Sequence, residues 1–200
     1  MTRVLITGAT GFVGRYLASL CAEQDAEVVG LSRRRPSEGE PPDALARYHE
    51  VDMVDAGATR EVIASERPGR IFHLAGEASV ADSWRRPQRV IEANVTGASN
   101  LLEAVREAAP EARVLLACSG TEYGAVPPEE LPMTEDRPLR PQDPYAVGKA
   151  CIDLLGGFFA DAYGSLARLE AATGWRPEVP LERTLADVLS WWEGVLTANG

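Results

Sequence analysis

Three evenly spaced glycines near the N-terminus constrain the fold of this chain more than any other feature. Gly8, Gly11 and Gly14 span the junction between an apolar run at residues 3–7 and an amphipathic stretch at residues 11–23. A continuous apolar run predicts a buried strand, and apolar residues at helical spacing predict a helix. The glycines therefore mark a sharp turn from a first strand into a first helix, as at the start of a βαβ unit.

This first helix and the turn before it predict a packing face and a phosphate site. Val13, Leu17 and Leu20 are expected to form the apolar face of the helix. The spacing G-x-x-G-x-x-G is one residue wider than the G-x-G-x-x-G fingerprint, and an ordinary glycine-rich turn is the alternative. At a strand-to-helix junction, the glycines would let a pyrophosphate reach backbone N–H groups at the positive end of the helix. The predicted dinucleotide-binding residues here are Gly8, Thr10, Gly11, Phe12, Val13 and Gly14.

Short apolar runs and helical patterns alternate along the chain, which predicts a parallel sheet. The expected strands are residues 3–7, 27–31, 48–51, 70–74 and 114–118, and the expected helices are 11–23, 59–66, 87–108 and 144–163. Proline-rich loops are expected at 37–43 and 126–143, and short tail helices at 166–172 and 181–196. We predict an α/β fold: a Rossmann-like parallel sheet with helices on both faces and a small helical C-terminal tail.

Composition excludes several classes of function. The chain has 20 basic and 30 acidic residues among 200, a formal net charge of −10, so we expect neither a nucleic-acid nor a membrane partner. Cys21, Cys118 and Cys151 are odd in number and form no C-x-x-C pair, so we expect neither a disulfide framework nor a metal site. No apolar run reaches the ~18 residues of a membrane span, and the N-terminus lacks signal-peptide features, so we expect a cytoplasmic protein.

The end of the second strand bears on which dinucleotide would bind. An NAD site is expected to place an acidic residue here for the ribose 2′-hydroxyl, whereas arginine suits the 2′-phosphate of NADP. Arg33 follows the strand, Arg34 is the reserve candidate, and no acidic residue occurs before Glu38. We therefore expect NADP(H) to be preferred, with NAD(H) possible; a solvated basic turn is the alternative.

Residues after the third and fourth strands extend the predicted site. Asp52 could hold the adenine amino group and Met53 could cover the ring, although an ordinary turn aspartate would look the same. Small residues at Leu74-Ala75-Gly76 suit a backbone that lies close to a dinucleotide. Asn94, within a predicted helix, is a further cofactor-binding candidate or else a surface amide.

A tyrosine and a lysine four residues apart carry the predicted chemistry. Tyr145 and Lys149 share one helix face, and Lys149 is the only lysine among the 20 basic residues. A phenol of pKa near 10 is a poor base at neutral pH, but a neighbouring ammonium and an oxidised nicotinamide both favour the phenolate. Ser119, at the end of the fifth predicted strand, can donate to the same substrate oxygen. Tyr145 and Lys149 would also contact the cofactor.

Together these motifs resemble an extended short-chain dehydrogenase/reductase of the NAD-dependent epimerase/dehydratase family, which acts on nucleotide sugars. The matching segments are Thr7–Gly14, His73–Gly76, Asn94–Gly97 with Leu101-Leu102, Ser119–Gly124 and Leu131–Lys149. The resemblance implies a catalytic triad of Ser119, Tyr145 and Lys149. Tyr145 would be the acid/base, Lys149 would hold the nicotinamide ribose and lower the tyrosine pKa, and Ser119 would orient the oxygen. It also implies a nucleotide-sugar substrate and a homodimer.

Comparison within the family favours a reductase. Sugar 4,6-dehydratases resemble one another in a glutamate three residues before the glycine of the Ser119–Gly124 motif, where this chain has Thr121, with Glu122 one place later. The proline-rich approach to Tyr145 is similar to 4-keto-6-deoxy-sugar reductases and to 4-epimerases. With the expected NADP preference, reduction of a nucleotide-diphospho-4-keto-6-deoxyhexose is the first choice. The alternatives are a 4-epimerase, then a 4,6-dehydratase.

The resemblance divides the chain into two parts. Residues 1–164 match the dinucleotide-binding domain with its active-site helix, and residues 165–200 are similar to the last helices of the family's substrate domain. Most of the C-terminal substrate lobe, roughly a third of a usual chain, is therefore expected to be lacking. This departure keeps two further alternatives open: a dinucleotide-binding remnant without activity, and a fragment that folds only within an oligomer.

Overall fold

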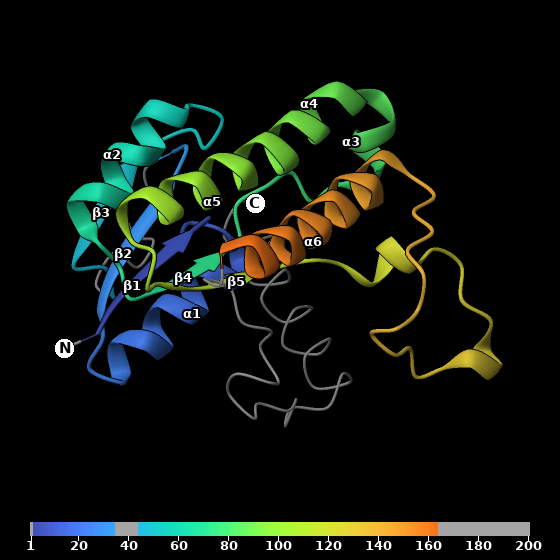
Figure 1. Cartoon of the computed structure of the whole chain (residues 1–200), viewed down its shortest axis with the longest axis horizontal. Coiled ribbons are helices and arrows are strands. Elements are labelled where there is room, and N and C mark those ends of the chain that lie inside the picture. Colours follow the sequence, from blue (N-terminus) through green and yellow to red (C-terminus); the bar gives the residue numbers. More distant parts are fainter. Residues whose placement is uncertain (1, 35–43, 164–200) are drawn as a thin grey trace, which may run out of the picture. The chain divides into compact units, whose positions relative to one another are not determined.

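A parallel sheet forms the centre of the protein. The computed structural model describes residues 2–34 and 44–163, and its strands lie side by side in the order β3-β2-β1-β4-β5 (Figure 1). Their bounds are β1 Arg3–Thr7, β2 Glu27–Ser32, β3 Arg47–Glu50, β4 Arg70–His73 and β5 Arg113–Leu116. All five predicted strands are confirmed to within a residue or two, and the order is that of a doubly wound, Rossmann-like sheet.

The order of the strands determines where a ligand can bind. The chain runs outward from β1 to β2 and β3, then returns across β1 to β4 and β5. Thr7, the last residue of β1, is in register with Leu31 of β2 and His73 of β4, so these strands end level with one another. Ligands of open parallel sheets bind at the carboxyl ends of the strands where the order reverses, which here is the end of β1.

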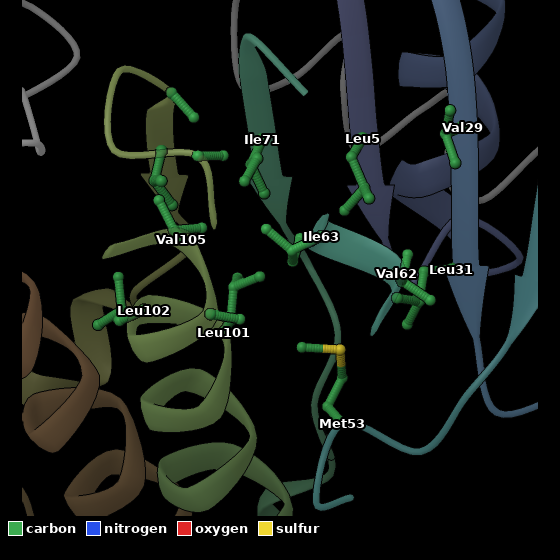
Figure 2. Packing of buried hydrophobic residues seen from close by; sticks show 14 of the residues in the cluster. Leu5, Val29, Leu31, Met53, Val62, Ile63, Ile71, Leu101, Leu102 and Val105 are labelled. Atoms are coloured by element: carbon green, nitrogen blue, oxygen red, sulfur yellow. The ribbon is translucent and has the colours of Figure 1, made fainter. Parts of the chain in front are cut away.

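One face of the sheet carries the main hydrophobic core. The helices on this face are α2 (Ala56–Glu66), α5 (Gly97–Ala108) and α6 (Pro144–Tyr163). Leu5, Val29 and Ile71 of the sheet pack against helix residues such as Ile63 and Leu101, all fully or almost fully buried (Figure 2). Each large side chain buried in this way contributes about 1.5–3 kcal/mol relative to exposure.

The opposite face is covered by α1 (Phe12–Glu23), and its packing corrects one prediction (Figure 1). Val13 and Leu20 were expected in the buried face, but their side chains are 56% and 52% exposed. Gly14 and Ala18 are buried instead, with Leu17 half-buried beside them. At Gly14 the helix touches the glycine turn so closely that no side chain fits, so the covered face runs through Gly14, Leu17 and Ala18 and leaves Val13 and Leu20 outside it.

Other predicted helices are confirmed with changes at their ends. α2 starts at Ala56, three residues before the predicted helix at 59–66, because Asp55 accepts a hydrogen bond from Ala58 N at 3.0 Å and caps it. α6 has the predicted bounds. The predicted loop at 126–143 contains only the short 3₁₀ helix η3 (Pro128–Glu130).

The long helix predicted at residues 87–108 is interrupted by a π-helical turn. It consists of α4 (Pro87–Ile91), the π-helix η1 (Glu92–Thr96) and α5 in direct succession. The short helix α3 (Val80–Arg85) precedes it and was not predicted, although Ser79 caps it by accepting from Asp82 N at 3.1 Å. π-turns inside helices are frequent at functional sites, and η1 carries Asn94.

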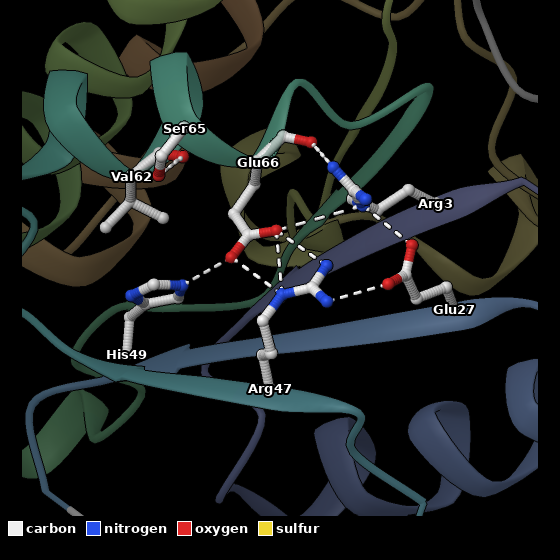
Figure 3. Close-up of polar contacts among 7 residues, drawn as sticks. All are labelled: Arg3, Glu27, Arg47, His49, Val62, Ser65 and Glu66. Atoms are coloured by element: carbon white, nitrogen blue, oxygen red, sulfur yellow. Dashed lines mark hydrogen bonds and ion pairs between the residues drawn. The ribbon is translucent and has the colours of Figure 1, made fainter.

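A charged cluster closes the amino-terminal edge of the sheet. Glu66, at the end of α2, accepts hydrogen bonds from Arg47 at 2.8 Å and from His49 at 2.8 Å, while Arg3 donates to its backbone carbonyl (Figure 3). Glu27 pairs with Arg3 at 2.8 Å and with Arg47 at 2.7 Å. We call these five residues the Glu66 cluster. Its acidic and basic side chains are paired with one another.

Some predictions fall outside the described residues: the loop at 37–43, both tail helices and the likeness of residues 165–200 to the last helices of the substrate domain. Within the residues described, no helix has the length and apolar character needed to cross a membrane. Across 2–34 and 44–163, no three His, Cys, Asp or Glu side chains are grouped so that they could hold a metal ion.

Candidate functional site

The glycine turn rests directly against the end of β4. Gly8 has a φ of 71°, and a Cβ there would lie 2.9 Å from the Ala75 nitrogen. A Cβ at Gly14 would lie 2.3 Å from the Gly8 carbonyl oxygen, closer than any side chain permits. Gly11 N donates to Gly8 O at 2.9 Å and fixes the turn. The helix therefore begins within contact of the turn, as backbone binding of a phosphate requires.

The first turn of α1 suits an anion. Its N-cap residue, Gly11, has no side chain to accept a hydrogen bond from that turn, and the turn contains no acidic residue. α2 differs, because the Asp55 carboxylate caps its N-terminus. The positive end of α1 therefore faces the carboxyl edge of the sheet without a negative side chain of its own, which fits the pyrophosphate of a dinucleotide.

A buried histidine joins the ends of β1 and β4. His73 Nδ1 lies 2.8 Å from the Thr7 hydroxyl, which in turn accepts a hydrogen bond from Ala75 N at 3.1 Å. Burial, with the Lys149 charge adding to it, lowers the pKa of His73 to about 3. A neutral histidine thus positions the Leu74-Ala75-Gly76 segment beside the glycine turn.

Asn94 lies inside the protein and holds a backbone segment. Its side chain is fully buried, accepts from Glu77 N at 2.8 Å and donates to Glu77 O at 3.2 Å. Gly76 has a φ of 153°, and a Cβ there would lie 2.5 Å from Asn94 Oδ1. The alternative of a surface amide is therefore wrong, and the structure shows Asn94 positioning Gly76 and Glu77; its contact with a cofactor stays a prediction.

A surface cavity of about 290 Å³ lies beside the end of β2, and the predicted residues Arg33 and Asp52 both line it, together with Arg89 and Glu92. Arg33 Nη2 lies 2.9 Å from Glu77 Oε1, and Arg89 Nη2 lies 3.2 Å from the same oxygen. Although partial burial acts to raise it, the two guanidinium groups hold the pKa of the Glu77 carboxyl below its ordinary value. We call Arg33, Glu77 and Arg89 the Glu77 cluster.

Met53 lies in the main core instead of in this cavity. Its side chain is 5% exposed and belongs to the cluster that contains Leu101 (Figure 2). The backbone carbonyl of Met53 accepts from Asn100 Nδ2 at 2.9 Å. Asp52 is exposed beside it and accepts from Val54 N at 3.2 Å, so of this pair only Asp52 lines the cavity, and its adenine contact stays a prediction.

Lys149 connects α6 to the end of β5. Its ammonium donates to Ala117 O at 2.6 Å and lies 5.9 Å from the centre of the Tyr145 ring. Burial lowers the pKa of Lys149, against the opposing influence of Cys118 and Glu122. The predicted tyrosine and lysine are thus brought together, and the carbonyl that fixes the lysine lies two residues before Ser119.

Ser119 begins the 3₁₀ helix η2 (Gly120–Tyr123), which packs against α6. Its hydroxyl lies 2.9 Å from the Thr121 hydroxyl and accepts from Thr121 N at 3.3 Å. Burial raises the pKa of the preceding residue, Cys118, to about 12, so that thiol is not an available nucleophile at neutral pH. η2 and its N-cap thus present two paired hydroxyls at this edge, those of Ser119 and Thr121.

Glu122 is buried in η2, and within the described residues its Oε2 has no hydrogen-bond partner. Burial raises the pKa of this carboxyl, and the charge of Asp153 adds to the effect. Sequence reasoning had placed Glu122 one position away from the dehydratase glutamate. Thr121, which occupies the position of that glutamate, is exposed, whereas the Glu122 side chain is buried.

Comparison with known proteins assigns the family. The sequence profile described as "NAD dependent epimerase/dehydratase family" matches residues 4–178. This chain belongs to the NAD-dependent epimerase/dehydratase family. It is 32% identical over 179 residues to GDP-mannose 4,6 dehydratase 2 of Arabidopsis thaliana, covering 82% of this chain and 47% of that protein. It is 29% identical over 153 residues to the GDP-6-deoxy-D-mannose reductase of Pseudomonas aeruginosa, covering 76% and 45% respectively.

A solved epimerase structure of this family has the same fold. The UDP-glucose 4-epimerase of Thermus thermophilus, in complex with NAD, matches with a TM-score of 0.75 and 31% identity over 82% of this chain and 52% of that one. The chain thus spans about half the length of the relatives it matches. The cradle of Gly8 and Gly14, with the uncapped start of α1, fits an NAD-type dinucleotide.

Proposed function

We propose that this chain contributes the dinucleotide-binding and catalytic half of an NADP(H)-dependent oxidoreductase that acts on a nucleotide-diphospho-sugar. The favoured reaction is reduction of a 4-keto-6-deoxyhexose. The observation that carries the proposal is Lys149: the only lysine of the chain is buried at the end of β5 and lies over the Tyr145 ring. That placement is what a tyrosine acid/base requires of its neighbour.

The proposed mechanism assigns one task to each residue. When bound, the reduced nicotinamide supplies the hydride that reaches the carbonyl carbon of the sugar. Tyr145 donates its phenolic proton to the carbonyl oxygen, so that a hydroxyl forms as the C–H bond forms. The Lys149 ammonium stabilises the resulting phenolate, and the Ser119 hydroxyl donates a hydrogen bond to the reacting oxygen.

The preference for NADP(H) is proposed from the two arginines at the end of β2 and on α4. Guanidinium groups bind phosphate with paired, charge-assisted hydrogen bonds, and Arg33 and Arg89 line one cavity with Asp52. NAD(H) binding is also proposed, because the family includes an epimerase solved with NAD. The homodimer, the cytoplasmic location and the boundary at residue 164 stay predictions.

A 4-epimerase is the second candidate, supported by the likeness to the Thermus epimerase. Epimerisation would use the same residues, with hydride removed from the sugar and returned to its other face. A 4,6-dehydratase is less well supported despite the Arabidopsis relative, because Thr121 occupies the glutamate position and Glu122 is buried.

The test mixes the full chain with NADPH and a nucleotide-diphospho-4-keto-6-deoxyhexose. Oxidation of NADPH is measured as the loss of its absorbance. Tyr145→Phe should reduce turnover by about 10³-fold and leave NADPH binding in place. Tyr16→Phe, an exposed tyrosine of α1, is the matched control and should retain turnover. Wild-type protein that binds NADPH but turns over neither this substrate nor a UDP-hexose would favour the non-catalytic remnant.

A further inference from the structure

In the Glu77 cluster, a carboxylate of the protein occupies the arginine side chains that were expected to bind the 2′-phosphate of a cofactor. One carboxylate oxygen of Glu77 is shared by Arg33 Nη2 at 2.9 Å and Arg89 Nη2 at 3.2 Å. Arg33 was predicted to bind a 2′-phosphate, and Arg89 reaches the same point from α4. Both guanidinium groups are therefore already paired with a negative charge of the protein itself.

The carboxylate is the fixed member of this cluster. Asn94, fully buried in η1, bonds both the N–H and the C=O of Glu77 and so anchors its backbone. The Glu77 side chain is 25% exposed, whereas those of Arg33 and Arg89 are 47% and 52% exposed. Because the arginines are long and solvated, they can turn towards a ligand more readily than Glu77 can withdraw.

A 2′-phosphate would have to share these donors with Glu77. Phosphate and carboxylate take the same N–H groups of a guanidinium, and two anions at one site repel each other. A free ribose 2′-hydroxyl is uncharged and meets no such repulsion. The Glu77 carboxylate is therefore expected to oppose NADP(H), whereas it can accept a hydrogen bond from the ribose 2′-hydroxyl of NAD(H).

We infer that Glu77 is a specificity-determining residue that sets the balance between NADP(H) and NAD(H), by competing with the 2′-phosphate for Arg33 and Arg89. The inference rests on the proposed function, since it concerns the same dinucleotide site. It also assigns Arg89, which no sequence motif marks, as the second phosphate-binding guanidinium. Such a site is tuned to accept both dinucleotides.

The experiment measures binding at the adenosine end alone. Adenosine 2′,5′-bisphosphate and 5′-AMP differ only in the 2′-phosphate, so the ratio of their dissociation constants by calorimetry reports the preference without any turnover. Glu77→Gln removes the charge and keeps the size, and should shift the ratio about fivefold further towards the bisphosphate. Arg89→Gln should shift it about tenfold the other way.

Arg85→Gln is the matched control, because Arg85 is 79% exposed on α3, pairs with Asp82 and does not line the cavity. It should leave the ratio unchanged. A Glu77→Gln protein whose ratio is unchanged, or shifted towards 5′-AMP, would overturn the competition. An unchanged ratio in Arg89→Gln would remove Arg89 from the site.

The outcome separates this inference from the proposed function. Wild-type protein that binds both probes, responds to Glu77→Gln as expected and yet has no turnover would contradict the enzyme and support the inference. Turnover of NADPH by the wild-type protein, together with an unaltered ratio of dissociation constants in Glu77→Gln, would support the enzyme and contradict the inference. Wild-type protein that binds neither probe would overturn both. Melting temperatures of the variants, expected to be close to wild type, confirm that each is folded.

Discussion

Two clusters in which glutamate is paired with arginine lie at opposite edges of the same sheet, and we expect them to have different roles. In the Glu66 cluster, at the amino-terminal edge, the glutamate side chain is 7% exposed and is bonded by Arg47 and His49 (Figure 3). In the Glu77 cluster, at the carboxyl edge, the glutamate is 25% exposed and both arginines border a cavity. The chemistry is nearly the same, so burial and location determine the role.

The difference follows from how parallel strands are arranged. Arg3 and Glu27 begin β1 and β2, and Arg47 begins β3, so charges at these positions meet at one edge and can neutralise one another. At the other edge the strands end in the glycine turn, Arg33 and the segment after His73, where the sheet order reverses and a ligand can enter. We therefore expect the first cluster to stabilise the fold and the second to affect binding.

The largest effect is expected from breaking the buried cluster. Glu66→Gln leaves Arg47 beside a neutral amide and should lower the free energy of unfolding by about 3 kcal/mol. Denaturant unfolding measures this loss. Glu23→Gln, an exposed glutamate at the end of α1, is the control and should stay within about 0.5 kcal/mol of wild type. A loss below about 1 kcal/mol for Glu66→Gln would show that these ion pairs stabilise the fold no more than exposed ones do.

The two ends should also differ in their response to acid. At the carboxyl edge, the pKa of His73 is about 3 in the folded state, below its ordinary value of 6.5, so the unfolded chain takes up a proton first as the pH falls. The contribution of neutral His73 to the free energy of unfolding is therefore fully present above pH 6.5. The free energy of unfolding should fall by about 2 kcal/mol between pH 7 and pH 5. Denaturant unfolding at each pH measures the slope, which His73→Gln should flatten.

His49→Gln, which removes the other histidine of the chain and keeps His73, should retain this slope. Burial acts to raise the pKa of Glu66, but the hydrogen bonds from Arg47 and His49 lower it overall. The stability that Glu66 supplies is therefore present above the ordinary glutamate pKa and lost only in more acidic solution. A slope between pH 7 and pH 5 that survives in His73→Gln would place the acid-sensitive group elsewhere.

The smallest effect on stability is expected at the exposed cluster. Glu77→Gln should change the free energy of unfolding by no more than about 0.5 kcal/mol, because its ion pairs are partly solvated. The same denaturant experiment as for Glu66→Gln measures it. A loss comparable to that of Glu66→Gln would erase the distinction between the two clusters and make Glu77 a structural residue.

Where the determining interactions are local, the sequence was sufficient. A continuous apolar run predicts a buried strand, and β1, β2, β4 and β5 were located from such runs, whereas the polar, partly exposed β3 followed from the βα alternation. The four-residue spacing of Tyr145 and Lys149 places them on one helix face in any fold that keeps the helix, and the lysine does lie over the tyrosine ring. The glycine turn likewise depends on neighbouring residues, since Gly14 meets the carbonyl of Gly8.

Where the determining contacts join distant residues, only the tertiary structure could decide. Arg33 meets Glu77 across 44 positions of sequence, and neither the partner nor Arg89 has a local pattern that marks it. Asn94 and Met53 looked accessible but are buried by the packing of η1 and α5. Val13 and Leu20 had the pattern of a core face, yet the contact of Gly14 with the glycine turn puts a neighbouring face of α1, with Gly14 and Ala18, against the sheet. Periodicity reports which residues share a face; the close approach of separate elements decides which face is covered.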